Sequence, residues 1–170
     1  MTEPTVHIIA GPTASGKSAR ALELARVHNG AVINADSLQI YQDLPILSAI
    51  PDAQEMGDTP HKLYGFLKPE QICSAQKWRE LAEIEIRACL DAGQTPIICG
   101  GTGLYIVTLT RGLSHIPDVD GTIRARFMAQ AESEGAPALH AYLTEHDPKA
   151  AARLHPNDTQ RLIRACEVFA

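Results

Sequence analysis

Hydrophobic residues follow two alternating patterns along the first 116 residues of the chain. Short apolar runs have the length and composition of buried strands, and longer stretches carry apolar side chains at helical spacing. The runs expected to form strands are 6–10, 31–35, 62–67 and 95–101. Helices are expected to start near Gly16 and to cover residues 74–93, where a serine can cap the start and a glycine ends the pattern. Alternating strands and helices predict an α/β fold, with a parallel sheet covered by helices on both faces.

The hydrophobic pattern changes near residue 117. From there to residue 170, helical patterns follow one another, separated by Pro, Gly and Asp, and no strand pattern appears. We therefore predict two parts, an α/β core over residues 1–116 and a small all-helical appendage over residues 117–170.

The composition is typical of a globular protein with an ordinary core. Hydrophobic residues make up 45% of the chain, and no run approaches the roughly 18 apolar residues of a membrane span. The N-terminus lacks a secretory pattern, so we expect a cytoplasmic protein. The four cysteines form no CxxC pair, which predicts ordinary apolar residues rather than metal ligands or disulfides. The net charge of −5 gives no bulk attraction to nucleic acid, so such binding would depend on locally placed cations.

A phosphate-binding loop follows the first predicted strand. Residues 11–18 read GPTASGKS and fit G-x-x-x-x-G-K-[ST] in full, with a strand pattern before them and a helix pattern after. Glycines let backbone N–H groups close around phosphate oxygens, and the helix N-terminus adds a positive dipole. Lys17 adds a charge, and Ser18 is expected to ligate a Mg²⁺ ion that bridges the phosphates. Together with the parallel sheet, the loop predicts an α/β fold of the P-loop NTPase type. It predicts a phosphate site, but kinases, NTPases and other diphosphate-binding enzymes share it.

Two further predicted strands end in residues that would reach the same edge of the sheet. Asp36 follows one of them, where it could act as a general base, hold Mg²⁺, or cap the turn after it. Gly100 and Gly101 end another, so the backbone there can approach a ligand, and Thr102 adds a hydroxyl. Because the C-terminal ends of parallel strands line one crevice, we expect these residues to lie beside the phosphate loop.

Five stretches of the sequence together resemble the tRNA dimethylallyltransferases, also called tRNA isopentenyltransferases. They are GPTASGKS, NADSLQIY, PHKLYGF, GGTGLY and DPKAAARLHPNDTQRLIRACEVF, of which the last is the most specific. The resemblance covers essentially the whole chain, which looks like the N-terminal half of a typical member. The family transfers a dimethylallyl group from its diphosphate to N6 of an adenosine beside the tRNA anticodon. The resemblance thus implies that diphosphate is a leaving group, held by the phosphate loop.

The resemblance also implies roles for individual residues. It makes Asp36 the catalytic base that takes the N6 proton, with Thr102 as a second catalytic residue. The residues implied to bind dimethylallyl diphosphate, with Mg²⁺ at Ser18, are Gly11, Thr13, Ala14, Ser15, Gly16, Lys17 and Ser18. The residues implied to contact the tRNA anticodon stem-loop are Asp36, Ser37, Leu38, Gln39, Thr102, Arg124, Gln160, Arg161 and Arg164. The helical region from residue 117 would then clasp the anticodon arm, and the protein is expected to be a monomer.

Three alternatives stay open at this point. A small-molecule P-loop kinase would share the loop, the aspartate and the glycines, although no compact arginine-rich lid is evident. An isopentenyltransferase acting on free adenine nucleotides would have the same strand ends but less need for the helical appendage. The third alternative is a non-catalytic fragment, because the family supplies a further diphosphate-binding arginine from C-terminal sequence outside these residues. On that ground we expect diphosphate binding with weak or no transfer.

Overall fold

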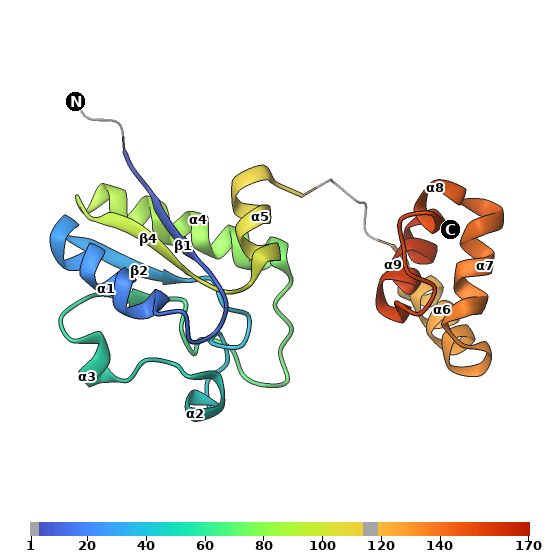
Figure 1. Ribbon diagram of the computed structural model, residues 1–170, viewed down its shortest axis with the longest axis horizontal. Helices are drawn as coiled ribbons and strands as arrows, with labels where there is room; N and C mark the ends of the chain where they lie inside the picture. Colours follow the sequence, from blue (N-terminus) through green and yellow to red (C-terminus); the bar gives the residue numbers. More distant parts are fainter. Residues whose placement is uncertain (1–3, 114–118) are drawn as a thin grey trace. The chain divides into compact units, whose positions relative to one another are not determined.

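The computed structural model describes residues 4–113 and 119–170 and divides into two compact units, Met1–Leu113 and Ser114–Ala170 (Figure 1). The elements of the first unit are β1 (His7–Ala10), α1 (Lys17–His28), β2 (Gly30–Asn34), α2 (Pro45–Ser48), α3 (Ala53–Met56), β3 (His61–Lys62), α4 (Ala75–Asp91), β4 (Thr95–Gly100) and α5 (Gly103–Arg111). Those of the second unit are α6 (Gly121–Glu134), α7 (Ala136–His146), α8 (Pro148–Ala151) and α9 (Thr159–Phe169). The predicted boundary between residues 116 and 117 lies outside the described residues. Within the described ranges, every helix is too short or too polar to span a bilayer.

The strands of the first unit form one parallel sheet in the order β1-β4-β2-β3 (Figure 1). The register pairs Ala10 of β1 with Gly100 of β4, and Asn34 of β2 with Cys99 of β4. The C-terminal ends of β1, β2 and β4 therefore lie level at one edge of the sheet. The predicted α/β fold with a parallel sheet is confirmed.

One predicted strand is much shorter than its sequence suggests. The apolar run 62–67 predicts a full strand, but β3 spans only His61–Lys62. The chain leaves the extended conformation because Leu63 (φ 61°) and Gly65 (φ 51°) have left-handed backbone. A leucine with positive φ is uncommon, and no hydrophobic pattern predicts it.

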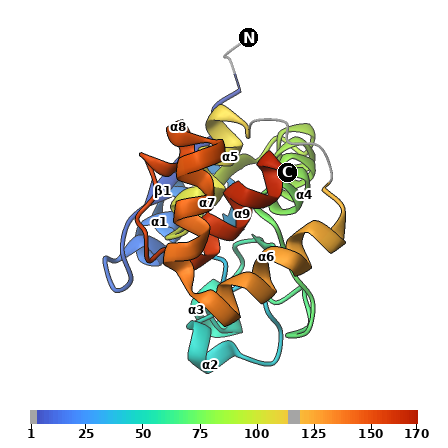
Figure 2. The same ribbon diagram turned by 90° about the vertical axis from the view of Figure 1, so that its right-hand side faces the viewer.

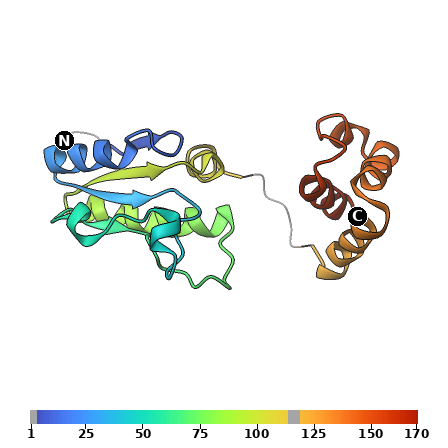
Figure 3. The same cartoon turned by 60° about the horizontal axis from the view of Figure 1, so that its bottom comes forward.

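Helices cover both faces of the sheet, with α1 on one side and α4 on the other (Figure 3). Side chains alternate along β2, so Ala31 and Ile33 pack toward α4, whereas Val32 packs toward α1. On the α4 side, Trp78 is completely buried, and its Nε1 donates to the backbone carbonyl oxygen of Asn34 at 2.8 Å. Trp78 is therefore a core residue of the first unit.

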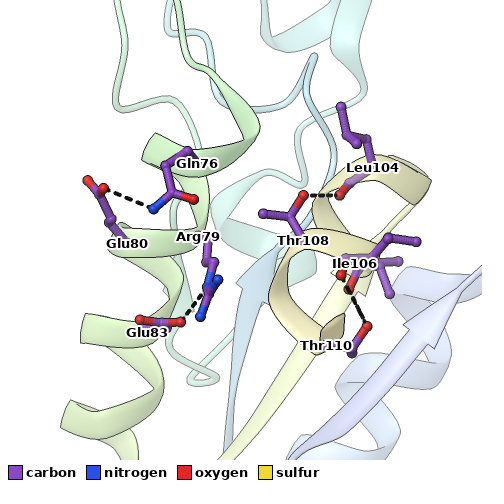
Figure 4. Close-up of polar contacts among 9 residues, drawn as sticks. Gln76, Arg79, Glu80, Glu83, Leu104, Ile106, Thr108 and Thr110 are labelled. Carbon is purple, nitrogen blue, oxygen red and sulfur yellow. Dashed lines mark hydrogen bonds and ion pairs between the residues drawn. The ribbon is translucent and has the colours of Figure 1, made fainter. Parts of the chain in front are cut away.

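Helices α4 and α5 pack side by side on this face, and their polar groups are satisfied locally (Figure 4). The rings of Trp78 and Tyr105 stack with centroids 4.5 Å apart. On α4, Arg79 Nε donates to Glu83 at 2.6 Å, an exposed i,i+4 pair that contributes about 0.3–0.5 kcal/mol. On α5, the buried Thr108 hydroxyl donates to the Leu104 carbonyl oxygen one turn earlier at 2.7 Å.

The second unit is a separate bundle formed by α6 to α9 (Figure 2). Its core consists of side chains from all four helices, and its fully buried members are Phe127, Leu139, Leu143, Leu162 and Cys166. Three helix starts are capped by aspartates, namely Asp120, Asp147 and Asp158. In the described residues of this unit all regular structure is helical, as the sequence pattern predicts.

Candidate functional site

Three loops meet where β1, β2 and β4 end. A side chain at Gly100 would place its Cβ 2.1 Å from the carbonyl carbon of Ala35, so only glycine lets these two backbones approach. A Cβ at Gly101 would lie 3.3 Å from the carbonyl oxygen of Gly11 and 3.5 Å from Asp36 Oδ2. The phosphate loop, Asp36 and the Gly100–Gly101 pair therefore lie together in the structure, as predicted.

The phosphate loop turns directly into α1 and leaves the start of that helix open. Gly16 is the N-cap residue with φ +79°, and no side chain caps the first turn. Ala14 also has positive φ (62°), and Ser15 folds back so that its Oγ packs against Gly11. Lys17 Nζ donates to the Pro12 carbonyl oxygen across the loop. Free backbone N–H groups, the helix dipole and one ammonium group are what a phosphate anion requires.

Asp36 has two carboxylate oxygens with different surroundings. Oδ1 accepts a hydrogen bond from the Leu38 N–H at 2.9 Å, so it caps the turn that follows β2. Oδ2 faces Gly101 beside the phosphate loop. The capping role and a chemical role are thus compatible, because each uses a different oxygen.

Thr102 fixes the segment that follows Asp36. Its Oγ1 accepts a hydrogen bond from the Ser37 N–H at 2.8 Å and donates to Ser37 Oγ at 3.2 Å. The Thr102 N–H in turn donates to the Ala35 carbonyl oxygen at 3.1 Å. These contacts make Thr102 a clamp between the end of β4 and the end of β2.

A cavity of about 290 Å³ lies between these loops. It contains predicted site residues from two loops, namely Thr13, Ala14, Lys17, Ser18, Asp36, Leu38 and Gln39. Four other residues that line the cavity were not predicted from the sequence, namely Leu47, Ser48, Ala49 and Cys99. Three of these come from the region of α2, where Gln39 Nε2 donates to the carbonyl oxygens of Ser48 (3.1 Å) and Ala49 (2.7 Å). No sequence motif predicts that the α2 region lines the cavity, because this depends on the hydrogen bond of the Gln39 side chain to the backbone ten residues later.

Two titratable groups beside Asp36 have raised pKa values, namely Cys99, which lines the cavity, and Tyr64. Burial raises the pKa of the Cys99 thiol; the nearby Lys17 lowers it and Asp36 raises it. Burial likewise raises the pKa of the Tyr64 hydroxyl far above its usual range, and the neighbouring Cys99 and Asp36 add to the effect. Both groups are therefore neutral at physiological pH, which leaves Lys17 and Asp36 as the charges of the cavity.

The predicted tRNA contacts of the second unit are described within that unit alone. Arg124 and Arg164 both donate to Glu167, at 3.0 and 2.9 Å, and the Glu167 side chain is only 7% exposed. Each arginine is about half exposed, and Arg161, which pairs with Asp158 at 3.5 Å, is 76% exposed. Gln160 precedes Arg161 in the first turn of α9. Residues of α8 and α9 line a cavity of about 730 Å³, and Arg161 and Arg164 are among them. Arg124 and Arg164 are thus structural partners of a buried carboxylate, and all three arginines are exposed enough to contact another molecule.

Comparison with known proteins places the chain in one family. The family model described as IPP transferase matches residues 39–170. The tRNA dimethylallyltransferase of Rhodospirillum centenum is 51% identical over 96% of this chain and 52% of its own length, and that of Desulfovibrio desulfuricans is 49% identical over 97% and 51%. The chain therefore spans about half the length of the curated relatives it matches.

Solved structures agree with this assignment. The tRNA isopentenylpyrophosphate transferase of Bacillus halodurans is 38% identical with a TM-score of 0.63, covering 98% of this chain and 55% of its own. A eukaryotic dimethylallyltransferase acting on tRNA is 29% identical with a TM-score of 0.83, covering 98% of this chain and 42% of its own. Because the family model spans most of the chain and its relatives match at about half identity, the chain belongs to the IPP transferase family.

Proposed function

We propose that this chain forms the donor-binding and base-carrying half of a tRNA dimethylallyltransferase, which moves a dimethylallyl group from its diphosphate to N6 of an adenosine beside the anticodon. The single observation that carries the proposal is the cavity shared by Lys17, Ser18 and Asp36 in a chain of this family. A phosphate-binding loop beside a carboxylate fits a reaction in which one group holds the departing diphosphate and the other accepts a proton.

The phosphate loop would bind the diphosphate through its backbone. The open N-terminus of α1 and the left-handed Gly16 present N–H groups, and Lys17 adds a positive charge. Holding the diphosphate stabilises the negative charge that grows on it as the carbon–oxygen bond breaks. This role needs no covalent contribution from the protein.

Asp36 would act as the general base. The lone pair of N6 attacks C1 of the dimethylallyl group, the bond from C1 to the diphosphate oxygen breaks, and its electron pair leaves with the diphosphate. The proton of N6 passes to the Asp36 carboxylate, whose Oδ2 does not carry the turn-capping hydrogen bond. A base is useful because the N6 lone pair is delocalised into the purine ring and the amine is a weak nucleophile.

Mg²⁺ fits this site as an ion held mainly by the substrate. Ser18 and Asp36 both line the cavity, and hydroxyl and carboxylate oxygens are ligands that Mg²⁺ accepts. In the described part of the chain, no three His, Cys, Asp or Glu side chains cluster as a metal site, so diphosphate and water would supply the other ligands. The ion would neutralise charge on the diphosphate.

The tRNA anticodon stem-loop would be the acceptor, with the target base turned out of its stack to reach the cavity. Ser37, Leu38 and Gln39 follow the proposed base in the sequence, so in this proposal they would contact that nucleotide. A guanidinium has five N–H donors, so Arg124 and Arg164 keep donors for phosphate oxygens while they pair with Glu167. In this proposal the protein acts as a monomer in the cytoplasm.

Transfer of label from dimethylallyl diphosphate tests this function directly. The chain is mixed in excess with an anticodon stem-loop RNA that carries an adenosine 3′ of the anticodon, and parallel mixtures contain labelled ATP. Label on the RNA that depends on Asp36 supports the proposal, whereas phosphate transfer from ATP supports a kinase instead. Competition by inorganic diphosphate measures donor binding separately.

Lys17→Ala should weaken binding of dimethylallyl diphosphate by about tenfold or more, as expected for one lost charge-assisted hydrogen bond. Lys77→Ala removes the same charge from the exposed face of α4 and should leave binding unchanged. Equal affinity of the two variants would contradict the assignment of the phosphate loop as the donor site.

A further inference from the structure

Asn34 is a buried polar residue with an unexplained arrangement at the end of β2. Its side chain is completely buried within an otherwise apolar strand. The other buried polar side chains of the described residues, Thr108 and Glu167, bond within their own helix or to surface arginines. Asn34 instead contacts the backbone of the loop that carries the proposed base.

Its amide makes three hydrogen bonds that use its full set of donors. Asn34 Oδ1 accepts from the Asp36 N–H at 2.8 Å, and Nδ2 donates to the carbonyl oxygens of Asp36 and Leu63, both at 3.0 Å. Two carbonyls need donors here and one N–H needs an acceptor, which fixes the orientation of the amide. A carboxylate has no donor and a hydroxyl has only one, whereas the asparagine amide has two donors and an acceptor. Asparagine is therefore the side chain of this length that satisfies all three groups.

Holding both backbone polar groups of one residue determines where its side chain points. The N–H and the carbonyl of Asp36 are both bonded to the same buried amide, so neither peptide plane can rotate without breaking a hydrogen bond. The Cα–Cβ bond of Asp36 is therefore fixed relative to the sheet. The third bond ties this frame to Leu63, whose left-handed backbone ends β3.

We propose that Asn34 is a positioning residue, which aims the Asp36 carboxylate into the cavity by holding both backbone groups of Asp36. The inference rests on the proposed role of Asp36 as the base. It predicts that Asn34 affects the chemical step and not the binding of the donor, because none of its contacts reaches the phosphate loop.

Asn34→Ala removes all three hydrogen bonds, and Asn34→Ser keeps a hydroxyl that can still accept from the Asp36 N–H. Thr108→Val is the matched control, since it removes an equally buried polar group on α5 that bonds only within its own helix. Near-UV circular dichroism selects conditions in which all three variants are folded.

The first measurement is amide hydrogen exchange in the chain itself. In Asn34→Ala, the Leu38 amide, which bonds to Asp36 Oδ1, should exchange faster by about tenfold, the fold-change for one lost hydrogen bond. The Ala35 amide, which bonds to the Cys99 carbonyl oxygen at 2.8 Å, should change far less. Asn34→Ser should restore part of the Leu38 protection, and Thr108→Val should leave the ratio of the two amides as it is.

The second measurement is single-turnover transfer at saturating donor. Asn34→Ala should lower the rate by at least about tenfold while the donor dissociation constant stays within about twofold. A uniform loss of protection at Leu38 and Ala35, or an equal fall in donor affinity, would show that Asn34 only stabilises the fold. If Asp36→Asn leaves transfer unaffected, the proposed function fails, and the exchange ratio alone then decides whether Asn34 orients Asp36.

Discussion

Replacing Asp36 by asparagine separates its two structural roles. The amide oxygen of the variant can still accept the Leu38 N–H that Asp36 Oδ1 accepts at 2.9 Å, so the turn after β2 keeps its cap. What disappears is the proton acceptor facing the cavity. Asp36→Asn should therefore remove the proton acceptor and keep the capped turn, whereas Asp36→Ala should remove both.

The expected magnitudes differ enough to be measured separately. A positioned general base contributes about 100-fold to 10,000-fold in rate, which corresponds to about 3–5 kcal/mol of activation free energy. Both variants should lose at least this much single-turnover transfer. In the free energy of unfolding, Asp36→Asn should stay within about 1 kcal/mol of the parent, and Asp36→Ala should lose about 1 kcal/mol more because the Leu38 N–H has no acceptor.

The assay is transfer of labelled dimethylallyl to a stem-loop RNA with the protein in excess, beside a donor-binding titration and urea unfolding. Asp52→Asn is the control, because Asp52 caps α3 through the same kind of bond, from Glu55 N–H to its Oδ1 at 2.8 Å. A transfer rate within tenfold of the parent would refute the assignment of Asp36 as base. A fall in donor affinity as large as the fall in rate would make Asp36 a metal ligand instead, and this second readout applies even to a parent chain that transfers slowly.

Two further changes test the surroundings of the site, and a third tests the second unit. Gly100→Ala forces a Cβ into the backbone at the end of β2, so urea unfolding should show a loss of about 2–3 kcal/mol or more, whereas Gly103→Ala, with no atom within 4 Å, should be neutral or stabilising. Thr102→Val removes the acceptor for the Ser37 N–H and should slow transfer about tenfold with unchanged donor affinity, and Thr102→Ser should restore the rate. Thr110→Val, which removes an exposed hydroxyl of α5, should change neither the rate nor the donor affinity. Glu167→Gln removes the charge shared by two arginines and should lower the unfolding free energy of the second unit by about 1–3 kcal/mol.

Local sequence signals were sufficient for the first unit wherever a side chain acts on its near neighbours. Each of three features, the phosphate loop, Asp36 and the Gly100–Gly101 pair, follows an apolar run. Parallel pairing of the three strands alone brings their C-terminal ends together. The apolar run 31–35 likewise predicts a buried strand, and every residue of β2 is buried. These predictions needed no knowledge of long-range contacts.

The parts that could not be predicted depend on contacts between distant residues or on unusual backbone. The strand predicted at 62–67 fails at Leu63, whose positive φ is supported by a hydrogen bond from Asn34, 29 residues earlier. Ala49, also with positive φ, enters the cavity only because Gln39 binds the backbone there. Glu167 looks like an ordinary helix surface residue until it is seen to bind Arg124 from another helix.

In the proposed function, donor binding and proton transfer depend on different kinds of structure in this chain. The phosphate loop uses backbone N–H groups and one lysine, which its own sequence supplies within eight residues. The direction of Asp36 instead depends on a buried amide before it and on the Thr102 clamp after it, both outside the phosphate-loop motif. A substitution in this second set leaves GPTASGKS intact, so a chain can retain the phosphate-loop motif and its donor affinity while losing the chemical step. The phosphate loop alone is therefore evidence for diphosphate binding, and evidence for transfer must come from the residues that orient Asp36.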